Sequence, residues 1–226
     1  ILVLCFNVGV YAAYALAATD VSYTKPNGTQ TSVKAALDEV YAKVPSHEIG
    51  DEVTVGGEQF YVLEWDNNCD TVNLISKYNL NTAGTAQQNA TYKTTACAFS
   101  STNYWSSSFT SSPFNLNDFI GYTATDAIGK AKSYGRSKGA VSSRLLSYEE
   151  ANALKSKESS NAKIKSMYRG NANTAEGYLT YWLGSAYKTS YVYSVSGYGG
   201  RLDADSYFSS SSGVRPVITV LKSKIS

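Results

Sequence analysis

The sequence has few of the residues on which most enzymes depend. It holds one histidine and three cysteines among 226 residues. Nucleophilic catalysis needs a base held against the nucleophile, yet the only histidine, His47, lies in a linker between a predicted helix and a predicted strand. The sequence also lacks a Cys/His cluster that would bind zinc and a glycine-rich loop that would hold phosphates. We therefore expect no catalytic residue, no metal and no cofactor.

Paired carboxylates, as used by glycosidases, are another route to catalysis. Glu149 and Glu150 are adjacent, but neighbours on a helix point about 100° apart. Glu150 is also accounted for as part of a helix cap. A glycan-active enzyme is therefore the weakest of the alternatives that remain.

Charge is also scarce. Charged residues make up 17% of the chain, and 20 Lys and Arg stand against 18 Asp and Glu without a run of either sign. A nucleic-acid-binding surface leaves a basic patch or stripe in the sequence, and this chain has none. Nucleic acid is therefore excluded as a partner.

The chain is rich instead in uncharged polar residues, with 19 tyrosines and many serines and threonines. Tyrosine offers a large amphipathic contact area at little cost in side-chain entropy, and Ser and Gly offer adaptable hydrogen bonding. This composition is typical of recognition loops. An ordinary secreted protein rich in β-structure would give a similar composition, so both interpretations stay open.

An uncharged apolar run opens the sequence, from Ile1 to Ala18. As a helix it would be ~27 Å long, close to the thickness of a bilayer's hydrocarbon core. The run could be a filament stem, a membrane anchor or an uncleaved secretion signal. Because no Met precedes it, we expect a processed chain that retains the run. A stem is favoured because neighbouring stems in a filament bury one another's sides.

The run resembles the N-terminal helix of type IV pilin-like subunits, which is processed and forms the filament core. Cys5 stands where bacterial type IV pilins usually carry an acidic residue. The resemblance covers residues 1–18 and implies a homopolymer held through these helices, a membrane during biogenesis and an extracellular location. The large side chains expected in assembly contacts are Leu2, Leu4, Phe6, Val8, Val10, Tyr11, Tyr14 and Leu16.

Two further cysteines, Cys69 and Cys97, lie beyond the apolar run. A disulfide between them would suit an extracellular protein and would contribute about 3–4 kcal/mol in the chain-entropy model. The alternative is a pair of buried free thiols. We predict the disulfide.

Residues 19–49 are predicted to form a linker and an amphipathic helix. Pro26-Asn27-Gly28 signals a turn. Apolar residues then recur at helical spacing from Val33 to Val44, with Thr31 or Ser32 as the cap and Pro45 as the stop. This helix packs either on the globular domain or on a neighbouring subunit.

From Gly50 onward the pattern predicts one domain, residues 50–226. Strands are expected at 52–55, 59–64 and 71–76, the first two joined by Gly56-Gly57. Residues 79–122 are expected to form long loops pinned by aromatic side chains. Helices are predicted at 125–134, after a cap at Ser147, and at 160–168. Further strands follow at 178–183, 190–195 and 213–221; Pro216 places the last at an edge or makes it start late.

Two segments carry a second resemblance: Tyr181-Trp182-Leu183-Gly184-Ser185-Ala186 and Gly213-Val214-Arg215-Pro216-Val217. Residues 50–226 are similar to the C-type-lectin-fold proteins of bacteria and phage, including ligand-display proteins diversified by retroelements. In that group a Trp-Leu/Ile-Gly strand precedes a variable surface and a Gly-X-Arg strand closes the domain. The resemblance implies an α+β domain with antiparallel strands, two or three helices and long loops.

The stretch between these segments has the composition of a binding surface. The resemblance implies that its side chains face solvent; alternatively, they pack between subunits. The carboxylates of Asp203 and Asp205 alone would make a weak cation site, so we expect no metal there. The candidate ligand-binding residues are Tyr187, Tyr191, Tyr193, Tyr198, Arg201, Asp203, Asp205 and Tyr207.

The sequence as a whole predicts an extracellular, pilus-like filament subunit that displays a ligand-binding or adhesion surface. Its expected partners are further copies of itself and a surface ligand, either a glycan or a protein. A membrane-anchored adhesin that does not polymerise and a purely structural filament subunit are the alternatives.

Overall fold

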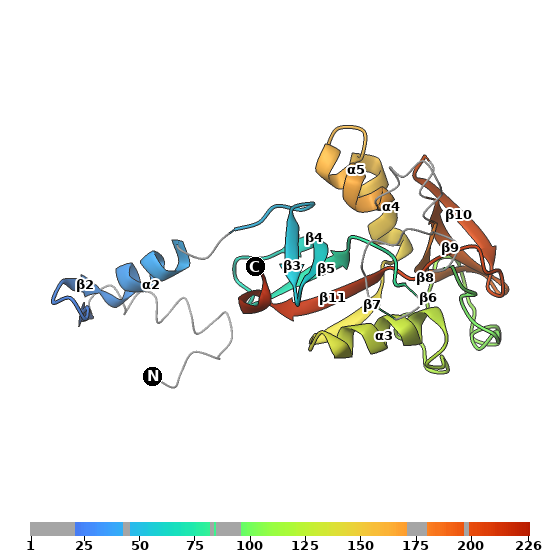
Figure 1. The fold of residues 1–226 in the computed structure, drawn as a ribbon, viewed down its shortest axis with the longest axis horizontal. Coiled ribbons are helices and arrows are strands. Elements are labelled where there is room, and N and C mark those ends of the chain that lie inside the picture. The colour runs from blue at the N-terminus through green and yellow to red at the C-terminus, as the bar shows by residue number, and fades with distance from the viewer. Residues whose placement is uncertain (1–20, 43–45, 82–83, 85–95, 171–179, 197–198) are drawn as a thin grey trace. The chain divides into compact units, whose positions relative to one another are not determined.

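A computed structural model describes residues 21–42, 46–81, 84, 96–170, 180–196 and 199–226. The chain divides into two compact units, residues 1–46 and 47–226 (Figure 1). The predicted apolar helix of residues 1–18 and its assembly residues lie outside the described residues. Among the residues that are described, no helix is both long enough and apolar enough to cross a membrane.

The described part of the first unit is a small hairpin followed by a helix. Strands β1 (Ser22–Thr24) and β2 (Gln30–Ser32) pair antiparallel, and α2 (Val33–Ala42) follows directly. The hydroxyl of Ser32 accepts a hydrogen bond from the backbone N–H of Ala35 at 3.0 Å, so the predicted cap is confirmed. The hairpin itself was expected to be linker, because three-residue strands are too short to show a period.

The second unit contains two antiparallel sheets, and together with its helices this confirms a mixed α and β fold. The strand order is β3-β4-β5-β11-β7 in the five-stranded sheet and β10-β9-β8-β6 in the four-stranded sheet. The strands are β3 (Glu52–Val55), β4 (Glu58–Trp65), β5 (Thr71–Ser76), β6 (Phe114–Asn115), β7 (Ser142–Leu145), β8 (Tyr181–Lys188), β9 (Tyr191–Ser196), β10 (Arg201–Ser206) and β11 (Pro216–Leu221). A short 3-10 helix, η2 (Lys222–Lys224), follows β11.

The described residues of this unit form three α-helices: α3 (Ala127–Ser137), α4 (Tyr148–Lys157) and α5 (Ala162–Arg169). All three lie where the sequence predicted helices, within three residues at each boundary that was predicted. Helix α3 packs on β7 and β11, and α4 packs on α5 and β8. The hydroxyl of Tyr134 on α3 donates a hydrogen bond of 2.7 Å to buried Glu58 on β4. This contact ties the helix to the five-stranded sheet.

Pro216 begins β11 rather than lying within it, and β11 pairs with β5 on one side and β7 on the other. Of the two expectations for this strand, the late start is therefore confirmed and the edge position is wrong. A proline at the first residue of a strand leaves the ladder beyond it intact, so the strand can still be central.

The four-stranded sheet has a different core on each face. Trp182, Ala186 and Val192 face a core that also contains Phe99 and Trp105. Tyr181, Leu183 and Val195 face a second core, formed with α4 and α5. Phe99 lies edge-on to both Trp105 and Trp182, at ring centroid distances of 5.7 and 5.8 Å. The expectation that aromatic side chains pin the loops before α3 is thus confirmed.

Candidate functional site

An open groove of about 500 Å³ lies on the four-stranded sheet. It continues the sheet face that α4 and α5 cover further along, because Tyr193 and Leu202 also pack against the second core. The groove is therefore the part of this face that the helices leave uncovered. Its lining residues are Tyr187, Lys188, Tyr191, Tyr193, Leu202, Asp203 and Ala204.

A bulge in β8 turns side chains toward the groove. Ala186 pairs with Val192, and Lys188 pairs with Tyr191, so β8 carries one more residue than β9 between these two pairs. Such an extra residue re-aims the side chains on the bulged strand. As a result Tyr187 and Lys188 both line the groove, and Tyr187 and Tyr191 remain 39% and 44% exposed.

Tyr193 is the centre of an aromatic stack at this groove. Its ring lies 4.2 Å from that of Tyr148 and 5.3 Å from that of Tyr187, measured between centroids. Its hydroxyl is 2.9 Å from the hydroxyl of Ser112, in a loop before β6. Contacts on three sides fix the orientation of Tyr193, so the stack is organised before any ligand arrives.

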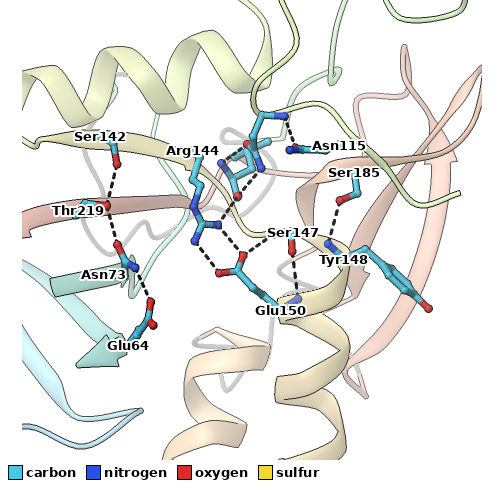
Figure 2. A network of polar contacts seen from close by, with 12 residues as sticks. Glu64, Asn73, Asn115, Ser142, Arg144, Ser147, Tyr148, Glu150, Ser185 and Thr219 are labelled. Carbon is cyan, nitrogen blue, oxygen red and sulfur yellow. Dashed lines mark hydrogen bonds and ion pairs between the residues drawn. The ribbon is translucent and has the colours of Figure 1, made fainter. Parts of the chain in front are cut away.

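Tyr148 was not among the predicted site residues, since it lies about forty positions before them in the chain. It is the first residue of α4, and its backbone N–H donates a 3.0 Å hydrogen bond to Ser185 on β8 (Figure 2). The predicted capping box did locate this helix start. The capping box could not show that the first residue of α4 lies beside β9.

A polar network holds the start of α4 (Figure 2). Ser147 and Glu150 form the reciprocal capping box, and Glu150 accepts two hydrogen bonds of 2.6 Å from the guanidinium of Arg144 on β7. Ser185, which receives the N–H of Tyr148, is itself buried. The position of the Tyr148 ring is therefore fixed by β7 and β8 as well as by its own helix.

The charged residues of the groove differ in how far they are engaged. Asp203 accepts hydrogen bonds from Arg201 at 3.2 Å and from the backbone N–H of Ala204 at 3.0 Å. The ammonium of Lys188 lies 5.0 Å from the centroid of the Tyr187 ring. Within the described chain no carboxylate lies in ion-pair range of Lys188. The groove thus presents one uncompensated positive charge.

Of the predicted site residues that the structure describes, Arg201, Asp205 and Tyr207 do not line this groove. Asp205 accepts hydrogen bonds from Ser206, Ser209 and Ser211 and so holds the turn after β10. Tyr207 packs against Trp105, with 5.7 Å between ring centroids, and lies half-buried against the first core. Tyr198 lies outside the described residues. Local composition marked these positions, but strand direction decides which face each side chain joins.

The predicted disulfide is wrong, because Cys69 and Cys97 are both free. Cys69 is exposed and donates to the carboxylate of Asp66 at 3.2 Å, and this hydrogen bond raises the pKa of its thiol. Cys97 packs against the first core, where burial raises its pKa. Cysteine spacing gives the length of the loop that a bridge would close but not the distance between the two side chains.

The remaining residues with chemical potential lie away from the groove. His47 packs edge-on against Trp65, with 4.9 Å between ring centroids, and its Nδ1 lies 3.7 Å from Oδ2 of Asp51. In the part of the chain that the structure describes, no group of three His, Cys, Asp or Glu side chains is placed to hold a metal ion. The groove offers aromatic faces, hydroxyls and one cation, which are groups that bind a ligand.

The chain was also compared with known proteins. No protein-family model, no curated protein and no solved structure matches it.

Proposed function

We propose that this chain is an extracellular surface subunit whose second unit binds a ligand in the tyrosine-lined groove. The observation that carries the proposal is the ordered stack of Tyr148, Tyr193 and Tyr187 beside an open concave surface. Rigid aromatic anchors around a depression are the features that dominate binding energy at recognition surfaces.

The exposure of the groove favours ligand binding over a purely internal role. Tyr187 and Tyr191 keep 39% and 44% of their surface exposed, whereas Tyr168 and Tyr181 in the adjoining core are buried. Tyrosines that served only to pack this domain would lie beneath α4 and α5. Contact with another copy of the chain would also cover the groove. Adhesion of the chain to cells distinguishes ligand binding from such a contact.

The arrangement of the two motif segments supports a C-type-lectin-like fold as part of the proposal. Trp182-Leu183-Gly184 lies in β8, and the same strand continues into Tyr187 and Lys188 of the groove. Arg215 directly precedes β11, the last strand. In the group that the sequence resembles, a Trp-Leu/Ile-Gly strand likewise precedes the ligand surface and a strand with a Gly-X-Arg start closes the domain.

The uncharged run of residues 1–18 is proposed to be the assembly segment. An apolar helix of that length is stable when neighbouring helices or lipid cover its sides. A pilus-like polymer would display many grooves at once, and this repetition would strengthen attachment to a surface with repeated ligands. A membrane-anchored adhesin is the alternative use of the same run.

The test is adhesion of beads coated with the full chain to bacterial and epithelial cells. Replacing Tyr187 and Tyr191 together with Ser should reduce adhesion about tenfold or more, because aromatic hot spots contribute about 1–2 kcal/mol or more each. Both side chains are exposed, so the melting temperature should change little. Phe208→Ser is the matched control, since it removes an exposed aromatic that does not line the groove.

Unchanged adhesion of the double variant would overturn the binding proposal. A chain that lacks residues 1–18, prepared in the same way as the full chain, should give soluble monomers and no fibres in negative stain. Fibres formed by the truncated chain would contradict the assembly role of residues 1–18. They would not bear on the proposal that the groove binds a ligand.

A further inference from the structure

The uncompensated cation of the groove indicates the chemistry of its ligand. Lys188 contacts the ring of Tyr187, and in the described residues it has no acidic partner. Asp203, the acidic residue of the lining, is already engaged by Arg201 and by the N–H of Ala204. An anionic group on a ligand would therefore find a free ammonium and a carboxylate whose charge is largely compensated.

The other groups of the groove suit a ring with one apolar face and hydroxyls at its edge. The hydroxyls of Tyr187 and Tyr191 make no hydrogen bond to the described chain, and Leu202 and Ala204 add an apolar surface to the lining. The electron-rich face of a tyrosine attracts C–H groups of a saturated ring, while its hydroxyl remains free to bind the ring's own hydroxyls. A pyranose has both kinds of group.

The edge of the sheet disfavours an acidic peptide. A peptide would gain most of its affinity by adding a strand to the edge of the sheet that lines the groove, which is β10. That strand carries Asp203 and Asp205, whose side chains accept the backbone N–H groups of Ala204 and Ser206. Because these side chains already hold backbone N–H groups that an added strand would need as donors, they oppose pairing along this edge.

We propose that the groove binds an acidic sugar unit of a polysaccharide, with the sugar ring against Tyr187 and Tyr191 and its carboxylate on Lys188. This inference rests on the proposed function, because it names the ligand class for the same site. Because the groove is open, a sugar unit in the middle of a long polysaccharide can bind there, and no chain end has to enter the site. A single site of this kind binds weakly, and the repeated acidic units of a polysaccharide match the repeated copies in an assembly.

The test compares short oligosaccharides that differ only in charge. Trigalacturonate should bind the full chain about fivefold more tightly than neutral trigalactose, since an exposed ion pair contributes a factor of about two to five. Lys188→Gln should erase this difference between the charged and the neutral sugar, and with it the dependence of trigalacturonate binding on salt. Lys155→Gln is the matched control, because Lys155 is an exposed lysine on α4 that does not line the groove.

Three results would overturn the inference: equal binding of the charged and neutral sugars, an unchanged preference in Lys188→Gln, or tighter binding of a tetraglutamate peptide than of trigalacturonate. None of these results would affect the adhesion test. If Tyr187 and Tyr191 prove necessary for adhesion while trigalacturonate does not bind, the ligand class is wrong and the binding function stands.

Discussion

At the scale of single residues, Arg215 shows how strongly the core constrains a polar side chain. It is 1% exposed, and the described groups around its charge are backbone carbonyls and an aromatic ring. The guanidinium donates to the carbonyls of Ser76 at 2.7 Å and Met167 at 2.6 Å, and it lies 5.0 Å from the ring centroid of Tyr181. Burial lowers the pKa of Arg215, and the nearby Tyr181 opposes that effect. Arg215 thereby joins β5, α5 and β8.

Replacing Arg215 with Lys should destabilise the domain by about 2–4 kcal/mol, because an ammonium cannot reproduce the planar fork and leaves a buried carbonyl without a donor. Denaturant unfolding measures this loss. Arg201→Lys is the control, since its side chain is 74% exposed and the change should cost less than about 0.5 kcal/mol. Equal stability of Arg215→Lys and the parent chain would show that the charge alone is sufficient.

At the scale of elements, the start of α4 connects stability to the groove. The helix begins at Tyr148, the residue whose ring stacks on Tyr193. Glu150 satisfies the N–H of Ser147 at 2.9 Å and also holds the guanidinium of Arg144. Fraying of this turn would move the Tyr148 ring away from the stack.

Ser147→Ala should lower the free energy of unfolding by about 1 kcal/mol through loss of the cap. Glu150→Ala should cost more, about 2 kcal/mol, because the ion pair with Arg144 is lost as well. Glu150→Ala should also weaken ligand binding. Glu149→Ala, which removes a neighbouring exposed carboxylate, is the control for charge at the helix start. A Glu150 variant with undiminished binding would show that the cap does not position Tyr148.

At the scale of the whole molecule, buried tyrosines link stability to alkaline pH. Burial is the main cause of the raised pKa values of Tyr134 and Tyr168, and it raises the pKa of Tyr181 to about 12. A raised pKa in the folded state means that the unfolded chain releases these protons first. The stability that these buried, neutral tyrosines contribute is fully present below the ordinary tyrosine pKa of 10.0 and is lost as pH rises above it.

The free energy of unfolding should therefore fall as pH rises above about 10, and Tyr134→Phe should make that fall less steep by removing one linked proton. Unfolding in denaturant at a series of alkaline pH values measures the slope, and phenolate absorbance reports when the buried tyrosines ionise. Ionisation of all tyrosines before any unfolding would contradict the prediction. An equally steep fall in Tyr134→Phe would exclude Tyr134 as a source of the linkage.

Much of the fold was predictable because its signals are local. The capping box of Ser147 and Glu150, the glycine pair between β3 and β4, and the alternation along β5 each depend on residues a few positions apart. Three strands of the second unit were missed: β6, which is only two residues long, and the longer strands β7 and β10. Both longer strands carry polar residues on an edge of their sheet, so neither shows the apolar alternation that reveals a strand with one buried face.

By itself the sequence determined the composition of the proposed binding surface and the elements on either side of it, because hydroxyl content, caps and turns are encoded locally. Only the tertiary structure decided which tyrosines meet. The bulge in β8 turned Tyr187 and Lys188 onto one face, and the docking of α4 on β8 brought Tyr148 to Tyr193. The turn after β10 placed Tyr207 against the first core instead. Register and helix docking depend on contacts between distant segments, and such contacts minimise the energy of the whole core rather than of any one stretch.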